Sequence, residues 1–208
     1  MCSGSRLVGS NHRVTVLKTM VRHLQFFFVA LLFAASPEIA VAALQPGETH
    51  RLTFRDVDGN DLSTDDGHVT IIAVVTRRSE EKARQISQLV PEHCIGDPKY
   101  RYITLVNFQK GLARPLQGIT RAVIRNRLDS EAKALQPRYA AKKITRDARR
   151  DVYVVADFDG AAVTQLGMSP DSNDVAVFVF SGTGKLVGRW VDVPPEAPFV
   201  SAIAAAER

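Results

Sequence analysis

Hydroxyl and guanidinium groups gather in residues 76–79 (TRRS), where two different sequence patterns meet. Residues 69–76 are nearly all β-branched or apolar, which predicts a strand buried on both faces. Residues 79–90 carry apolar side chains at helical spacing. A strand-to-helix turn presents free backbone N–H groups and the positive end of a helix dipole, and both attract anions. Three residues therefore form a candidate binding site for a carboxylate, sulfate or phosphate: Arg77, Arg78 and Ser79.

The same turn also fits an ordinary helix start. Ser79 is a favourable N-cap residue. Glu80 and Glu81 already place negative charge at the positive end of the helix. From the sequence both interpretations stay open, and binding of phosphate or sulfate would distinguish them.

Cys94 is the other candidate for chemistry, and it lies beside His93 in residues 91–97 (PEHCIGD). A thiol becomes a reactive thiolate in an electropositive setting or at a helix N-terminus. No such setting is predicted here, and adjacent residues seldom aim their side chains at each other. Cys94 is therefore a weak candidate nucleophile with His93 as its base, and an inert loop cysteine is the favoured alternative.

Two acidic segments resemble metal sites but are better explained as turns. Residues 56–61 (DVDGND) have glycine at the fourth position and no closing glutamate, unlike a calcium-binding loop. They predict a hairpin turn instead. In residues 157–160 (DFDG), Asp159 is expected to cap the next helix. We expect neither a metal ion nor a cofactor.

Residues 1–42 have the pattern of a cleavable signal peptide. Basic residues precede an uncharged apolar run at 24–37, and small residues with Ala-x-Ala spacing follow it. Met20 stands directly before this pattern, so residues 1–19 are interpreted as an over-extended start. Cleavage after Ala42 predicts a periplasmic or secreted protein. Nucleic acid is then an improbable partner.

The 208 residues, of which 45% are hydrophobic, suffice for one domain with a proper core. Without the predicted signal peptide this domain spans residues 43–208, and Cys94 is its single cysteine. A single cysteine forms neither an internal disulfide nor a Cys-x-x-Cys redox pair.

Residues 112–151 hold eleven Lys or Arg and four acidic residues, whereas the rest of residues 43–208 has net negative charge. This basic segment has helical spacing that we expect Pro137 to break. The favoured interpretation is a solvated helix whose charges pair with the acidic remainder. The alternative is attraction to an anionic membrane surface.

The apolar runs predict the order β-hairpin, β, α, β, α, β, α, β, β, α, which implies an α/β domain with a mixed sheet. The expected strands and helices outside the basic segment are 51–54, 69–76, 79–90, 102–108, 152–156, 161–166, 175–180, 186–191 and 194–206.

This order resembles that of the thioredoxin-fold redoxin group, which includes exported thioredoxin-like proteins and peroxiredoxins. "LTFRDVDGNDLS" is similar to the opening hairpin of the group, and "VTIIAVVT" to the strand that delivers its active-site loop. "VAVFVFSGTGKLVGRWV" is similar to its late hairpin. The resemblance implies a thioredoxin-like fold for residues 43–208, with 112–151 as a basic helical insert.

The chain departs from this group at its redox centre. The resemblance places Arg78 and Glu81 where the two cysteines of Cys-x-x-Cys would stand, and Val175 where the family has a cis-proline. It therefore implies a non-catalytic periplasmic binding or accessory module, whose partner is a protein or a small anion. The alternatives are a thiol-dependent oxidoreductase or peroxidase-like protein acting through Cys94, and a protein of the anionic membrane surface.

Overall fold

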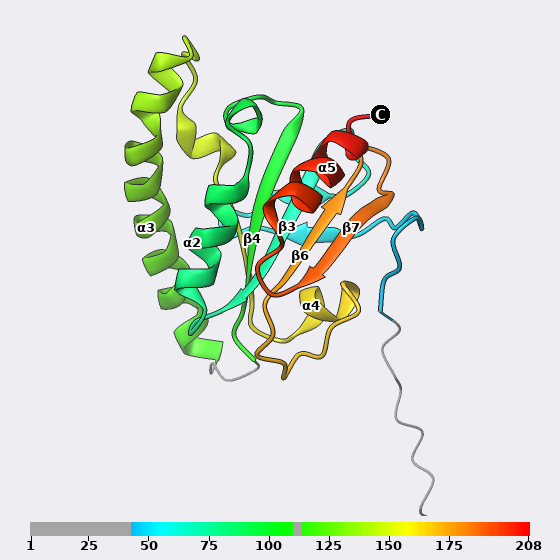
Figure 1. Cartoon of the computed structure of the whole chain (residues 1–208). Helices are drawn as coiled ribbons and strands as arrows, with labels where there is room; N and C mark the ends of the chain where they lie inside the picture. The colour runs from blue at the N-terminus through cyan, green and yellow to red at the C-terminus, as the bar shows by residue number, and fades with distance from the viewer. Residues whose placement is uncertain (1–42, 110–113) are drawn as a thin grey trace, which may run out of the picture. The chain divides into compact units, whose positions relative to one another are not determined.

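The computed structural model describes residues 43–109 and 114–208, and the predicted signal peptide lies outside these residues. A five-stranded sheet, flanked by helices, and a separate two-stranded hairpin make up the domain (Figure 1). The strands are β1 Thr53–Arg55, β2 Asp61–Ser63, β3 Val69–Thr76, β4 Tyr100–Asn107, β5 Tyr153–Asp157, β6 Ala176–Phe180 and β7 Leu186–Val191. The helices are α2 Glu80–Leu89, η2 Glu92–Cys94, α3 Arg114–Ala141, η3 Ala148–Asp151, α4 Ala161–Gln165 and α5 Glu196–Ala206.

The large sheet has the strand order β5-β4-β3-β6-β7. Strands β3, β4 and β5 run parallel, whereas β6 is antiparallel to β3 and β7 is antiparallel to β6. The central strand β3 is buried at every residue, as its uninterrupted β-branched sequence predicts. The mixed α/β sheet is therefore confirmed, and outside the basic segment the elements begin and end within two residues of their predicted boundaries.

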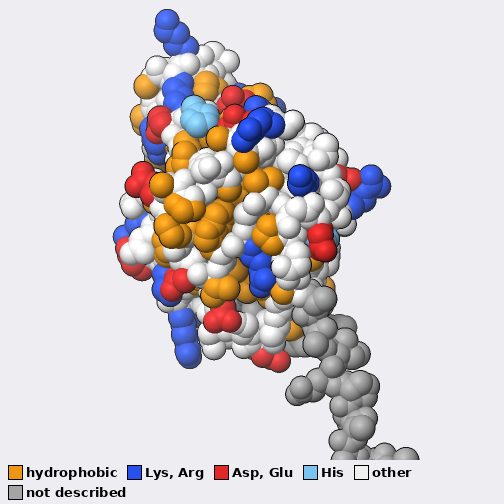
Figure 2. Space-filling model, turned by 45° about the vertical axis from the view of Figure 1, so that its right-hand side comes forward, with side chains coloured by type: hydrophobic (Ala, Val, Ile, Leu, Met, Phe, Trp, Pro, Cys, Tyr) orange, Lys and Arg blue, Asp and Glu red, His pale blue; other side chains and the backbone are white. Residues whose placement is uncertain are grey.

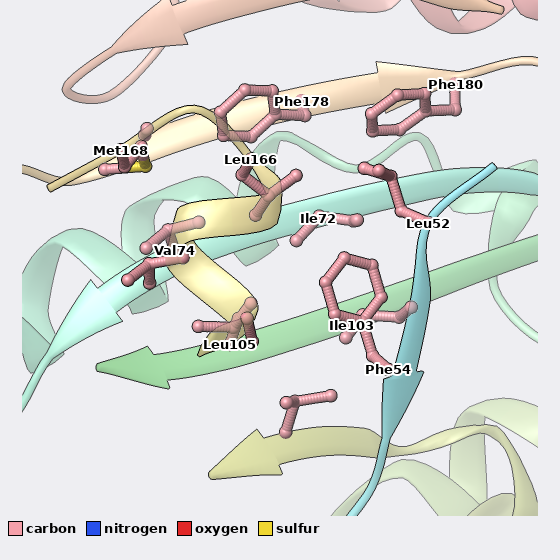
Figure 3. Close-up of a cluster of buried hydrophobic side chains, with 14 of the residues drawn as sticks. Leu52, Phe54, Ile72, Val74, Ile103, Leu105, Leu166, Met168, Phe178 and Phe180 are labelled. Carbon is pink, nitrogen blue, oxygen red and sulfur yellow. The ribbon is translucent and has the colours of Figure 1, made fainter. Parts of the chain in front are cut away.

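Two apolar clusters cover the two faces of the sheet, because successive side chains of a strand point to opposite sides. On one face, Ile72 and Val74 of β3 pack with Phe178 of β6, with Leu166 after α4 and with Phe54 of the hairpin (Figure 3). On the other face lie α2 and α5 (Figure 1). These layers leave little freedom in the position of β3, from whose carboxyl end the chain enters α2.

Strand β4 is covered unequally on its two faces. Ile103 and Leu105 are fully buried in the core, whereas Tyr102, Thr104 and Val106, which point to the opposite face, are only half-buried. A strand in the interior of a sheet normally has both faces covered when helices pack on each side. The α2 side of β4 is therefore incompletely covered by side chains.

The expected break of the basic segment at Pro137 is wrong, because α3 continues through this residue to Ala141. Proline removes one helical hydrogen bond and costs about 3 kcal/mol in a helix interior. Contacts just beyond it offset this cost. Tyr139 is buried and its hydroxyl donates to Asp151 at 2.6 Å, and Arg138 forms an ion pair with Glu92.

The basic side chains of α3 and of the segment after it are largely neutralised within the domain. Five of them form ion pairs with acidic residues outside residues 112–151, which confirms the pairing interpretation for these five: Arg125, Arg127, Arg138, Lys142 and Arg149. Arg146 pairs with Asp151 inside the segment. Figure 2 shows acidic and basic side chains interspersed on the face it draws, rather than a surface of one sign.

The turn before α4 corrects the expected helix cap. The carboxylate of Asp157, not that of Asp159, reaches furthest into the helix: it accepts hydrogen bonds from the backbone N–H groups of Gly160 at 2.8 Å and Val163 at 2.9 Å. Asp159 accepts one from Ala161 at 3.0 Å. Asp157 ends a strand and is buried, so the last strand residue aims its side chain into the helix that follows.

This arrangement predicts unequal costs for two similar substitutions. Asp157→Ala leaves two N–H groups without their acceptor and is expected to lower the free energy of unfolding by about 2 kcal/mol. Asp159→Ala is expected to lower the free energy of unfolding by less than about 1 kcal/mol. Urea denaturation of both variants measures the difference, and equal losses would contradict the assignment of Asp157 as the cap.

Candidate functional site

The turn at residues 76–79 joins β3 to α2 through a compact set of hydrogen bonds. The Ser79 hydroxyl lies 2.7 Å from the backbone nitrogen of Thr76, which donates to it, and 3.1 Å from the Thr76 carbonyl. Arg78 donates its backbone N–H to the Thr76 hydroxyl at 3.3 Å. Ser79 is the N-cap residue of α2, as expected, but its side chain makes no hydrogen bond to the first helical turn. The hydroxyl instead fixes the shape of the turn.

The two arginines of this turn have different surroundings. Both are exposed, and neither has an ion pair among the described residues. Arg77 lies at the wall of a large cavity, whereas Arg78 is not part of that wall. The three residues of the predicted anion site are thus neighbours in the chain without converging on one point, and anion binding at the turn stays a prediction.

The cavity has a volume of about 730 Å³ and lies between α2, α3 and the incompletely covered face of β4. Its floor is formed by Tyr102, Thr104 and Val106 of β4. One wall belongs to α2 and η2, and the other belongs to α3, which runs beside α2 (Figure 1). Ligand pockets in proteins commonly measure about 300–1,000 Å³. The cavity is therefore large enough to hold a small organic molecule.

Three of the residues by which α2 and α3 line the cavity have small side chains. Ala83 and Ser87 of α2 lie one turn apart, and Ala134 of α3 belongs to the opposite wall. Ion pairs join the two sides at both ends: Glu80 pairs with Arg127, and Glu92 pairs with Arg138. The small side chains leave space between the two walls, and an ion pair joins the walls at each end of this space.

The floor of the cavity offers a pair of hydrogen-bonded hydroxyl groups, those of Tyr102 and Thr104. The Tyr102 side chain is hydrogen-bonded to Thr104, and burial raises the pKa of its hydroxyl well above the usual range. The hydroxyl therefore remains protonated at neutral pH. The Tyr102 side chain is half-buried, because it borders the cavity. A few polar groups in a mainly apolar pocket orient a ligand.

Cys94 borders the same cavity near Tyr100 at the start of β4, and its thiol is buried. Burial raises the pKa of this thiol to about 12, and the negative charges of Glu207 and Asp97 add to the increase. His93 contacts Tyr100 and approaches Glu207 at 3.6 Å, and no contact joins it to the thiol. The setting is the reverse of the electropositive one that activates a cysteine. At neutral pH Cys94 is a protonated thiol.

The cavity was not predicted from the sequence, although two weak sequence patterns indicate it. In β4 the polar side chains of Tyr102 and Thr104 alternate with those of Ile103 and Leu105, which is unusual for a strand inside a sheet. The inward face of α2 carries Ala83 and Ser87 where a larger apolar residue would fill the space. Neither signal indicates that a second helix stands opposite.

No protein-family model matches the chain, and no curated protein does either. Solved structures that resemble it include the exposed lipoprotein thioredoxin of Streptococcus pneumoniae, with 14% identity over 75% of this chain and 99% of that one, at a TM-score of 0.47. Another is a peroxiredoxin-like protein from Aquifex aeolicus, with 13% identity, coverage of 79% and 89%, and a TM-score of 0.47. A thiol:disulfide interchange protein from Chlorobium tepidum has 12% identity, coverage of 79% and 99%, and a TM-score of 0.47.

The element order of the described domain is the one that the sequence shares with the thioredoxin-fold group: hairpin, β3, α2, β4, α3, β5, α4, β6, β7 and α5. The fold is thioredoxin-like. In this thioredoxin-like domain the first described helix begins at residues 79–80 without a cysteine. Helix α3 lies within the basic segment 112–151, and the interpretation of this segment as an insert stays a prediction. Within residues 43–109 and 114–208, no helix is long and apolar enough to cross a membrane.

The surroundings of Cys94 predict how slowly it reacts. Because the pKa of the folded Cys94 thiol is about 12, its alkylation by iodoacetamide in the native protein, followed on the Cys94 peptide by mass spectrometry, is expected to show no titration step between pH 7 and about 10. The same protein in concentrated guanidinium chloride is expected to react with an apparent pKa of about 8.5. A native step near that value would show an accessible thiol with an ordinary pKa.

Proposed function

We propose that this chain is a non-catalytic binding module, which holds a lipophilic small molecule between α2, α3 and β4. The observation that carries the proposal is the cavity of about 730 Å³, because its floor and walls are mainly apolar and include the Tyr102–Thr104 hydroxyl pair. Apolar pockets with a few convergent polar groups are the usual form of a small-molecule site.

The protonated state of Cys94 supports binding over thiol chemistry. A nucleophilic thiol must reach the thiolate form, and a pKa of about 12 leaves almost none of it at neutral pH. Residues 78–81 supply no second thiol at the start of α2. Activity as an oxidoreductase or a peroxidase through Cys94 is therefore disfavoured.

The membrane-surface alternative has less support than the cavity. Six of the basic side chains that suggested it are engaged in ion pairs with acidic residues of the domain. Paired charges attract an anionic surface less strongly than free ones, since each pair is close to neutral.

The proposed module acts outside the cytoplasm. This part of the proposal rests on the signal-peptide pattern of residues 1–42 alone. A periplasmic or secreted domain with an apolar cavity is suited to carrying a molecule that dissolves poorly in water.

A neutral dye tests the binding proposal. Nile red fluoresces strongly in apolar surroundings, so the purified protein is expected to increase its fluorescence in a saturable way. The substitution Ala134→Phe places an aromatic ring in the α3 wall and is expected to abolish the increase.

Ala122→Phe is the matched control, because it makes the same change at an exposed position of α3 outside the cavity wall. It is expected to leave Nile red binding unchanged. Thermal unfolding of both variants checks that they are folded. Equal dye binding by wild type and a folded Ala134→Phe variant would refute the proposed function.

A further inference from the structure

The cavity extends along β4, which fixes its long axis. Tyr100 borders it near one end of the strand and Val106 near the other, and six residue steps at ~3.3 Å span roughly 20 Å. Cys94 and Asp97 lie at the Tyr100 end. An occupant of this space is elongated rather than round.

The charges that line the cavity are almost all neutralised by ion pairs. Arg127 is shared between Glu80 and Glu131, and Arg84 pairs with Glu81 at 3.2 Å. At the other end Arg101 pairs with Asp66 and Arg138 with Glu92. The lining residue Asp151 pairs with Arg146, which lies outside the lining. An additional charge on a ligand therefore finds few free partners.

Two lining residues are exceptions, and they lie at opposite ends. Arg77 directly follows Thr76, which is paired with Asn107 at the carboxyl end of β4, and its guanidinium has no ion pair among the described residues. Asp97 precedes the amino end of β4, and its carboxylate accepts a backbone N–H from Lys99 but likewise forms no ion pair there. The cavity thus has a free cation at one end and a free anion at the other.

The start of α2 adds to the positive end. The Ser79 hydroxyl is engaged with Thr76 and makes no hydrogen bond to the first turn of the helix. The N–H groups of that turn therefore remain available beside Arg77. The carboxylate of Glu80, which lines the same end of the cavity, is paired with Arg127. The charge of Asp97 disfavours a second anion at the Cys94 end.

From this polarity we infer that the ligand is a long-chain monocarboxylate, bound with its carboxylate at Arg77 and its hydrocarbon chain along β4 toward Cys94. This inference rests on the proposed function, which requires only that the cavity binds a lipophilic molecule. The chain buries its apolar surface against Val106, Thr104 and Tyr102. The carboxylate gains a charge-assisted hydrogen bond from the guanidinium.

The test compares a charged probe with its uncharged counterpart. cis-Parinaric acid is a fluorescent long-chain fatty acid, and its methyl ester has the same chain without the charge. Wild-type protein is expected to bind the acid more tightly than the ester. Arg77→Gln is expected to weaken binding of the acid about tenfold, which corresponds to about 1.4 kcal/mol, and to leave binding of the ester unchanged.

Arg55→Gln is the control, since it removes an exposed arginine of β1 that lies outside the cavity wall and outside the turn at residues 76–79. It is expected to leave the affinity for both probes unchanged. Equal effects of the two substitutions, or equal affinity of wild type for acid and ester, would overturn the inference.

The outcomes also separate the inference from the proposed function. If both probes bind equally and Ala134→Phe abolishes both, the carboxylate inference fails while the binding function stands. The same holds if neither probe binds although Nile red does. If Nile red also fails to bind, both fall together.

Discussion

The separation of α3 from α2 is the constraint on which the cavity depends. The ion pair Glu80–Arg127 joins α2 to α3 at one end of the opening, and Glu92–Arg138 joins η2 to α3 at the other. Between them the walls carry small side chains such as Ala83 and Ala134, which do not fill the space. Exposed ion pairs contribute little to stability singly, so the buried anchor Tyr139 at the end of α3 carries more of the packing.

The same separation accounts for the environment of Cys94. Its thiol is buried and borders the cavity, beside the negative charges of Asp97 and Glu207. In the thioredoxin-like domain the carboxyl end of β3 leads into residues that supply hydroxyl, guanidinium and N–H groups instead of thiols. These groups are the ones that the proposed binding function uses.

Local patterns predicted the fold well where burial follows from the chain itself. The β-branched run of β3 and the alternation in the hairpins each predict a strand from the local sequence alone. The order of the strands in the sheet then determines their neighbours. Pro137 was misjudged because local propensity disfavours it, while contacts with residues far away in the chain hold the helix around it. The cap of α4 was assigned to Asp159 because the buried direction of Asp157 depends on the sheet.

The candidate site was only partly visible from the sequence, since a cavity is a property of distant segments. Arg77 was identified from its turn, but its place at the cavity wall follows from α3, which begins after the next strand.

The most direct measurement of the proposed site is the set of nuclear Overhauser effects between bound Nile red and the protein. The account predicts contacts to the Tyr102 ring and the Ala134 methyl group. Contacts to Trp190 and Val191 of β7 in their place would contradict it.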